Sequence, residues 1–256
     1  MSIEIIGISV VKNEDIYLSQ AIKNIINFCD KIIIVDNNSS DETVAIAKKY
    51  VSQYPDKISL RLVDKISDLQ SIVTPFVGEN KWIFGVDGDE LYDPNGLHKL
   101  RSRILEGGYQ NYWMLRGYFF HLIKINLKSQ IGVGYLAPPS KDPNKLYNFK
   151  LLKSWDGDGK QTIFHPYTHV FKNEKYNTFH LPKRKFLFKK SKWEDCMLRC
   201  VHTRLLKRSS KEDYEGDINY RLNMTDVVKD RDTNYREKYR IGNKKEKDIS
   251  AFLDES

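Results

Sequence analysis

Apolar and polar positions along the first ninety residues predict strands and helices in alternation. Residues 3–11 form a largely apolar, β-branched run, and residues 31–36 are nearly all apolar, as in strands buried on both faces of a parallel sheet. Residues 58–63 and 82–86 predict two more strands. Residues 13–28 carry apolar side chains close to helical spacing, and a second helix is expected to follow the capping residues Ser39, Ser40 and Asp41 and to continue to Tyr50. This order predicts a doubly wound α/β sheet with right-handed crossovers.

The pattern changes after this first unit. Asp93-Pro94 is an N-cap and N1 pair for a helix over residues 97–105, and residues 112–188 are aromatic and strand-like. Ser191 and Ser209 each precede a glutamate by three residues, which is the spacing of a capping box. Two C-terminal helices are therefore expected after these serines.

Composition places the chain among ordinary globular proteins. Its 256 residues are 40% apolar and 12% aromatic, which is enough for one domain with a full core. No apolar run approaches the roughly 18 residues of a membrane span, and the first residues carry no export signal. Cys29, Cys196 and Cys200 lack C-x-x-C spacing, so we expect reduced thiols in a cytoplasmic protein. Cys196 and Cys200 would share one face of a C-terminal helix.

Positive charge is concentrated in the second half of the chain. The formal net charge is +8, but residues 1–140 hold 15 basic and 16 acidic side chains (net −1), whereas residues 141–256 hold 27 and 18 (net +9). Such a half favours an anionic partner, which is nucleic acid, an anionic membrane surface or the phosphate groups of a small ligand.

An acidic pair directly follows the fourth predicted strand. Asp87 and Asp89 flank Gly88, so both carboxylates share one side of an extended chain, and the glycine permits a close approach. Ligands bind outside the carboxyl ends of strands in open α/β sheets, and oxygen ligands at this spacing suit Mg²⁺ or Mn²⁺ on a diphosphate. The plain alternative is a surface turn. An EF-hand is excluded because its sixth and twelfth positions would be Tyr92 and His98.

Polar clusters also follow the first two predicted strands. Asp36 ends the second strand, and Asn38 tolerates the positive φ of a tight turn into the next helix. Val10, Val11, Asn13 and Glu14 close the first strand. Although each cluster alone reads as a capping loop, three neighbouring strand ends then carry polar groups on one edge of one sheet.

These three segments resemble the family 2 glycosyltransferases. The resemblance lies in Val11-Lys-Asn-Glu14, in the run from Phe28 to Thr43 and in the run from Trp82 to Leu91, and it is closest to the bacterial branch with a D-x-D-E acidic motif. It implies a GT-A fold, in which a Rossmann-like, doubly wound, mostly parallel sheet joins a mixed acceptor half with C-terminal helices. The implied units are a nucleotide-sugar-binding half (1–110), an acceptor-binding half with the helices (111–240) and a charged, disordered tail (241–256).

The resemblance also implies roles for individual residues. Asp36 would hydrogen-bond the base of the donor, Asp87 would lie near ribose and metal, and Asp89 would ligate Mn²⁺ or Mg²⁺ on the donor diphosphate. The expected nucleotide-sugar site comprises Val10, Val11, Asn13, Glu14, Asp36, Asn38, Gln70, Asp87 and Gly88. Relatives often place a basic residue beside Gln70, whereas this chain has none there, so the phosphate-neutralising charge must come from elsewhere.

Late segments supply further candidates. Residues 200–204 resemble the segment in which a histidine completes the metal site, so His202 is the third expected ligand, with a packed helix histidine as the alternative. Tyr176 to His180 resembles the family's aromatic strand, but Leu181 replaces the acid that often follows it. His165 and His169 are candidates for phosphate or acceptor contacts. A basic segment is expected to close over the diphosphate or to face an anionic membrane: Lys183, Arg184, Lys185, Lys189 and Lys190.

The resulting expectation is metal-dependent, inverting transfer from a UDP-sugar to a hydroxyl of a glycan or glycolipid, with no specific nucleic acid bound. A carboxylate base is expected at Asp195 or Glu194, although Glu194 also completes a capping box. Two alternatives stay open. A sugar-nucleotide nucleotidyltransferase would normally show a Gly-rich basic loop after the first strand, which is absent here. A non-catalytic protein that binds nucleic acid or an anionic membrane would use the basic half.

Overall fold

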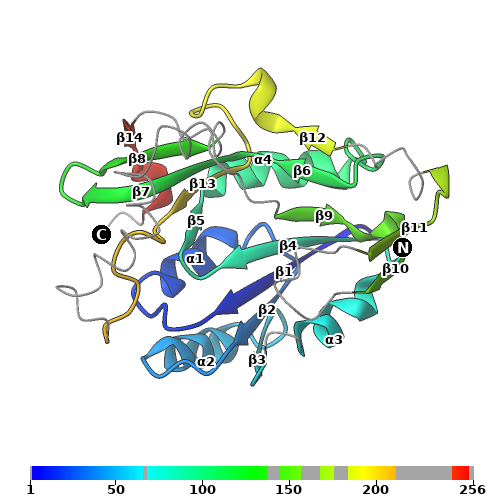
Figure 1. Cartoon of the computed structure of the whole chain (residues 1–256), viewed down its shortest axis with the longest axis horizontal. Coiled ribbons are helices and arrows are strands. Elements are labelled where there is room, and N and C mark those ends of the chain that lie inside the picture. Colours follow the sequence, from blue (N-terminus) through cyan, green and yellow to red (C-terminus); the bar gives the residue numbers. More distant parts are fainter. Residues whose placement is uncertain are drawn as a thin grey trace, which may run out of the picture.

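A seven-stranded sheet runs through the middle of the protein (Figure 1). The computed structural model describes residues 2–65, 68–137, 145–156, 168–175, 184–211 and 244–253. The strand order is β12-β6-β9-β4-β1-β2-β3. Four adjacent strands of this sheet run parallel to one another: β1 (Glu4–Val11), β2 (Lys31–Asp36), β3 (Ile58–Leu62) and β4 (Lys81–Asp87). The mostly parallel α/β sheet predicted from the sequence is therefore confirmed.

The register of the central strands brings their polar ends together. Val11 of β1 lies opposite Asp36 of β2, and Val10 lies opposite Asp87 of β4. Because these strands are parallel, their carboxyl ends meet at one edge of the sheet, which we call the rim. The rim consists of the ends of β1, β2 and β4 with the loops that follow them.

Helices and a hairpin cover the two faces of this sheet. One face packs against α1 (Leu18–Ile25), α2 (Thr43–Gln53) and α4 (Pro94–Leu105). The other face packs against α3 (Leu69–Val73) and the hairpin of β10 (Leu152–Asp156) and β11 (Thr168–Phe171). Alternate residues of β1 enter the two cores, since Ile5 belongs to the first and Ile6 to the second. This alternation follows from the two-residue repeat of a strand.

A second, five-stranded sheet has the order β14-β8-β7-β13-β5. It contains β5 (Glu90–Tyr92), β7 (Tyr118–Asn126), β8 (Ile131–Ala137), β13 (Arg199–His202) and β14 (Lys244–Asp248). The remaining strands are β6 (Met114–Arg116), β9 (Leu146–Asn148) and β12 (Arg184–Phe186), and short 3-10 helices cover Thr74–Phe76, Phe149–Leu151, Leu187–Lys190 and Ser250–Phe252. The chain passes from the first sheet to the second at the acidic pair, between β4 and β5.

The prediction of a helix after Ser191 is wrong. Residues 199–202 instead form β13, which pairs with β5 on one side and β7 on the other. A short apolar run is compatible with either a helix or a buried strand, and burial of Cys200 and Val201 between two neighbours decides for the strand. The side chain of Ser191 donates to Leu187 O (2.9 Å) and caps no helix. Cys196 and Cys200 therefore share no helix face.

Residues 244–253 also differ from the expected frayed tail. β14 pairs antiparallel with β8, and Ile249 and Phe252 are buried in the core of the second sheet. These two apolar anchors hold a strongly charged edge strand in place, because their burial offsets the cost of ordering it. Among the described residues, no helix is both long and apolar enough to cross a membrane.

The start of α4 follows the sequence prediction and joins the two sheets. The carboxylate of Asp93 accepts from Asn95 N (3.0 Å), and Pro94 occupies the first turn. The same carboxylate accepts from Arg199 Nε of β13 (2.9 Å), and both side chains are largely buried. One carboxylate therefore caps a helix and also neutralises a buried cation.

We expect Asp93→Ala to lower the free energy of unfolding by about 3 kcal/mol, because it removes an N-cap and leaves Arg199 without its partner. Urea unfolding followed by circular dichroism measures this change. Asp93→Asn keeps the cap acceptor and should recover part of the loss. Asn95→Ala keeps the backbone donor and is the matched control. A loss in Asp93→Ala no larger than in Asn95→Ala would contradict the assignment.

Candidate functional site

The loops after β1 and β2 fix each other at the rim. Asn13 and Asn38 have positive φ angles (53° and 57°), as tight turns require, and the prediction for Asn38 is confirmed. Asn13 N donates to Ser39 Oγ (2.9 Å), and Ser40 N donates to Asn13 Oδ1 (2.8 Å). Asp36 lies between these loops, almost fully buried, and its Oδ1 accepts from Ser39 N (3.0 Å). The polar ends of β1 and β2 are therefore one connected unit.

Glu14 is buried and turned toward the acidic pair. Its backbone N donates to the buried hydroxyl of Thr43 (2.8 Å), which fixes the residue at the start of the turn before α1. A side chain on Gly88 would collide with Glu14 Oε2 and would lie 3.0 Å from Val11 Cγ1. The sequence predicts a close approach of a ligand at Gly88, whereas the atoms that approach it in the structure belong to the side chains of Glu14 and Val11.

Asp89 sits between two cationic groups. Arg208 Nη1 lies 2.9 Å from Glu14 Oε1 and 3.0 Å from Asp89 Oδ2, so one guanidinium joins the two acids. His202 Nε2 lies 3.5 Å from Asp89 Oδ1. Burial disfavours the ionised form of Asp89, but the charges of His202 and Arg208 outweigh it and hold the pKa of Asp89 well below its ordinary value.

His202 reaches Asp89 because of the register of the second sheet. It lies opposite Glu90 of β5 and opposite His121 of β7, and one histidine Nδ1 hydrogen-bonds the other across 2.9 Å. Burial lowers the pKa of His202, and the nearby carboxylate of Asp89 raises it. The effect of the carboxylate is the larger one, so the pKa of His202 lies above its ordinary value. The structure therefore favours a charged His202 against an ionised Asp89.

Asp87 belongs to a second ionic cluster. Lys145 Nζ lies 2.8 Å from Asp87 Oδ2 and 2.9 Å from Glu90 Oε1. Glu90 Oε2 accepts from Asp87 N and from the hydroxyl of Tyr92 (both 3.2 Å). Lys145 is buried, which disfavours its charge, but the two carboxylates raise its pKa above the ordinary value. Burial raises the pKa of Glu90 to about 7, despite the opposing charge of Lys145.

The rim carries more acid than base. Glu14, Asp87, Asp89 and Glu90 face three basic side chains, Lys145, Arg208 and His202, and burial together with Asp89 raises the pKa of Glu14 well above its ordinary value. Three buried carboxylate oxygens have no hydrogen-bond partner among the described residues: Glu14 Oε2, Asp36 Oδ2 and Glu90 Oε1, of which the last lies 2.9 Å from Lys145 Nζ in an ion pair. Excess carboxylate and unpaired buried oxygens favour ligands that bring positive charge or hydrogen-bond donors.

The chemistry of this set fits a hard divalent cation, but Lys145 and Arg208 already occupy its carboxylates. Within the described ranges, no three His, Cys, Asp or Glu residues are gathered in a way that would hold a metal ion. Of the three predicted ligands, His202 lies beside Asp89, while Asp87 is paired with Lys145. The assignment of Asp87, Asp89 and His202 as metal ligands stays a prediction.

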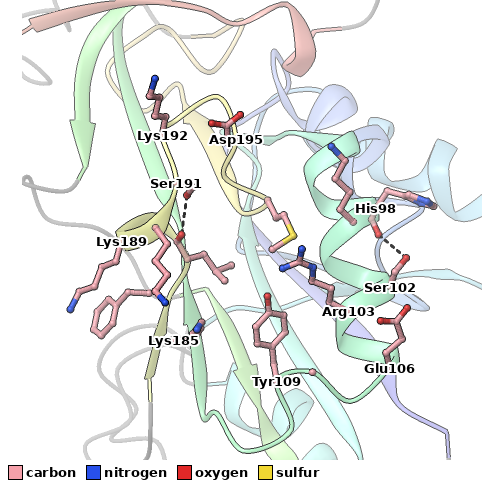
Figure 2. Close-up of a pocket in the computed structure, with 16 residues that line it drawn as sticks. His98, Ser102, Arg103, Glu106, Tyr109, Lys185, Lys189, Ser191, Lys192 and Asp195 are labelled. Atoms are coloured by element: carbon pink, nitrogen blue, oxygen red, sulfur yellow. Dashed lines mark hydrogen bonds between the residues drawn. The ribbon is translucent and has the colours of Figure 1, made fainter.

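The two predicted bases have contacts away from the rim. Glu194 is exposed and pairs with Lys247 Nζ of β14 (2.6 Å). Asp195 lines a separate hollow beside α4, which is shown in Figure 2. Neither residue contacts an acid of the rim through these interactions. The assignment of Asp195 or Glu194 as the general base therefore stays a prediction.

Other predicted positions are distributed more widely. Val10 and Val11 lie at the rim, whereas Gln70 is half-buried on α3. His169 lies in β11, and Arg184 begins β12. Four predictions fall outside the described residues: His165, Lys183, the segment from Tyr176 to Leu181 and the helix expected after Ser209.

Lys145 and Arg208 are site residues that the sequence analysis missed. Lys145 is 58 positions from Asp87, and Arg208 is 119 positions from Asp89 and 194 from Glu14. Neither belongs to a motif. The charge split was the one indication, since both come from the basic half of the chain.

Comparison with known proteins was made at the level of sequence and of structure. Residues 8–214 match the model of "Glycosyl transferase family 2". An uncharacterized glycosyltransferase of Rickettsia typhi is 25% identical over 173 residues, which cover 66% of this chain and 46% of the relative. One from Rickettsia prowazekii is 36% identical over 81 residues, which cover 32% of this chain and 26% of the relative. The chain thus spans less than half the length of these relatives.

Solved structures give weaker likenesses. S. aureus TarS in complex with UDP is 16% identical, with a TM-score of 0.39, over 60% of this chain and 50% of that protein. Glucosyl-3-phosphoglycerate synthase from Mycobacterium tuberculosis, solved with Mn²⁺ and UDP, is 15% identical, with a TM-score of 0.30, over 45% of this chain and 44% of that protein. Membership of the family therefore rests on the sequence match.

The titration of Glu90 yields a testable pH dependence of stability. The pKa of Glu90 is about 7 in the folded protein and 4.5 ordinarily, so the folded state holds a proton that the unfolded state releases in this window. The free energy of unfolding should therefore fall as the pH rises from 4.5 to 7, by up to about 3 kcal/mol from this group. His202, whose pKa is also raised, acts in the same direction.

We expect Glu90→Gln to reduce this pH slope, because glutamine does not titrate, while Lys145 keeps its pair with Asp87. Urea unfolding at pH 5 and at pH 7.5 measures the slope. Glu106→Gln makes the same change at an exposed position at the end of α4 and is the matched control. Equal slopes in wild type and Glu90→Gln would show that Glu90 titrates normally.

Proposed function

Because the chain belongs to glycosyl transferase family 2, we propose that it transfers a sugar from a nucleotide-sugar donor to a hydroxyl group of an acceptor. The donor is bound at the rim, with UDP as its nucleotide, and the acceptor is a glycan or glycolipid. The single observation that carries this proposal is the unpaired, buried carboxylate oxygen of Asp36. Its buried Oδ2 has no hydrogen-bond partner among the described residues.

A nucleoside base is the ligand that suits this oxygen. Asp36 ends β2 beside the loop of β1, and an acid at a strand end in an α/β sheet commonly binds the nucleoside of a ligand. The imide N–H of uracil would donate to Oδ2, while Oδ1 remains bound to Ser39 N. Binding would then repay the cost of burying an unpaired carboxylate oxygen.

The diphosphate of the donor requires positive charge near the acidic pair. Lys145 and Arg208 supply two cations within the rim, and each of them is already paired with two carboxylates. A divalent metal, Mn²⁺ or Mg²⁺, would be held by Asp89 and Asp87, with His202 beside Asp89. When bound, such an ion stabilises the negative charge that develops on the leaving diphosphate.

Arg208 competes with a metal for the same carboxylate. Its guanidinium occupies Glu14 Oε1 and Asp89 Oδ2, so a metal ion at Asp89 must displace it or share the acid with it. Arg208 therefore sets how readily the rim accepts a second cation. Inverting transfer further requires a base near the acceptor hydroxyl, and Asp195 is proposed for this role on the family resemblance alone.

The proposed function is tested by donor hydrolysis with a panel of nucleotide sugars, together with UDP binding by calorimetry. Asp36→Asn should weaken UDP binding about tenfold or more, because it places an amide where the base needs an acceptor. Asp30→Asn makes the same change at the opposite end of β2, where the carboxylate pairs with Arg101, and is the matched control. If no nucleotide sugar were hydrolysed and both variants bound UDP equally well, the proposal of a donor site at the rim would be rejected.

A second experiment addresses the metal. We expect Arg208→Gln to lower the Mn²⁺ concentration that gives half-maximal thermal stabilisation, because it removes a competing cation and leaves Glu14 and Asp89 less neutralised. Thermal unfolding during a Mn²⁺ titration measures this. Arg204→Gln lies four residues away at an exposed position and is the matched control. A higher Mn²⁺ requirement in Arg208→Gln than in Arg204→Gln would show that Arg208 does not compete.

A further inference from the structure

A hollow of about 1550 Å³ lies between α4 and the segment 185–192 (Figure 2). Small-molecule sites commonly have volumes of about 300–1,000 Å³, so this hollow is large enough for a ligand of several groups. Figure 2 shows Arg103 of α4 facing the segment 185–192 across the opening, with Tyr109 between them. We call this hollow the α4 pocket.

The α4 pocket is separate from the rim. β12, which leads into one wall of the pocket, is the edge strand of the seven-stranded sheet, and β6 and β9 lie between it and β4. Adjacent strands are about 4.8 Å apart, so three strand spacings separate β12 from the strand that carries Asp87. None of the rim acids is among the residues that line the pocket.

The lining of the α4 pocket is strongly cationic. Six basic side chains line it, two from α4 and four from the segment opposite: Lys99, Arg103, Lys185, Lys189, Lys190 and Lys192. Only two carboxylates, Glu106 and Asp195, join them among the described lining residues. None of these six cations forms an ion pair with a carboxylate of the described residues. Their mutual repulsion is relieved by a bound anion.

Two further features suit a ligand that combines charged and apolar parts. Tyr109 and Leu187 are largely buried residues that line the pocket, one aromatic and one aliphatic. Two of the lysines are positioned over aromatic rings, with Lys189 Nζ 4.5 Å from the ring centroid of Phe186 and Lys185 Nζ 5.5 Å from that of Tyr112. These contacts hold the two ammonium groups beside the aromatic rings.

We propose that the α4 pocket binds a ligand that carries two or more phosphate groups, at a site distinct from the rim. Arg103 and the lysines of the opposite wall supply positive charge for the phosphates from two sides, which suits a ligand with more than one anionic group. Asp195 limits the excess of positive charge within the pocket. A soluble phosphorylated compound and an anionic lipid headgroup present the same chemistry, and the experiment separates them.

The test combines Arg103→Glu with Lys189→Glu, which reverses one exposed charge on each wall. Lys48→Glu with Lys49→Glu is the matched control, because it reverses two exposed charges on α2 and changes the net charge equally. One arm titrates inorganic pyrophosphate by calorimetry. The other measures sedimentation with vesicles of phosphatidylglycerol and phosphatidylcholine, against vesicles of phosphatidylcholine alone. Circular dichroism establishes that both variants are folded.

We expect the pocket variant to bind its probe about tenfold more weakly than wild type, and the control to bind normally. Loss confined to pyrophosphate identifies a soluble phosphorylated ligand, and loss confined to phosphatidylglycerol vesicles identifies a lipid headgroup. Either result supports the proposal. Equal binding by the pocket variant and the control in both arms would overturn it. The donor assays at the rim are unaffected by this outcome, so the two proposals fail independently.

Discussion

Buried carboxylates at the end of the parallel sheet are the constraint on which the rest of the structure depends. Glu14, Asp87, Asp89 and Glu90 lie close to one another where β1 and β4 end, and all but Asp87 are almost fully buried. Ionised groups are tolerated in such surroundings only when they are paired. The fold meets this demand by bringing Lys145 and Arg208 to the rim from distant parts of the chain. The remaining excess of acid is what gives the rim its capacity for a further cation or donor.

The junction of the two sheets explains why the acids lie there. The chain leaves the first sheet after Asp87 and enters the second at Glu90, so the acidic motif is the link between them. β5 then pairs with β13, which places His202 opposite Glu90 and beside Asp89. Thr203 N also donates to Asp89 O (2.9 Å), so the backbone of the link is held as well as its side chains. A change in the register of the second sheet would therefore alter the charges of the first.

The excess positive charge of the second half serves more than one place. Lys145 and Arg208 are committed to the rim, whereas Lys185 and Lys189 face the α4 pocket. The basic segment that was expected to close over the donor diphosphate therefore lies, where it is described, at the edge of the sheet beyond β6 and β9. Residues 8–214, which match the family model, include both the rim and the lining of the α4 pocket.

The sequence by itself determined the four strands β1 to β4, the helices α1, α2 and α4, the capping of α4 by Asp93, the tolerance of Asn38 for a positive φ and the meeting of three polar strand ends. Each of these follows from local periodicity or from the direction of parallel strands, which neighbouring residues specify. Only the tertiary structure decided that residues 199–202 are a strand, because a four-residue apolar run fits either state until its neighbours bury it. It alone also placed Lys145 and Arg208 among the acids. Lys145 is separated from Asp87 by 58 positions and Arg208 from Asp89 by 119 positions, and ion pairs over such separations produce no periodic pattern in the sequence.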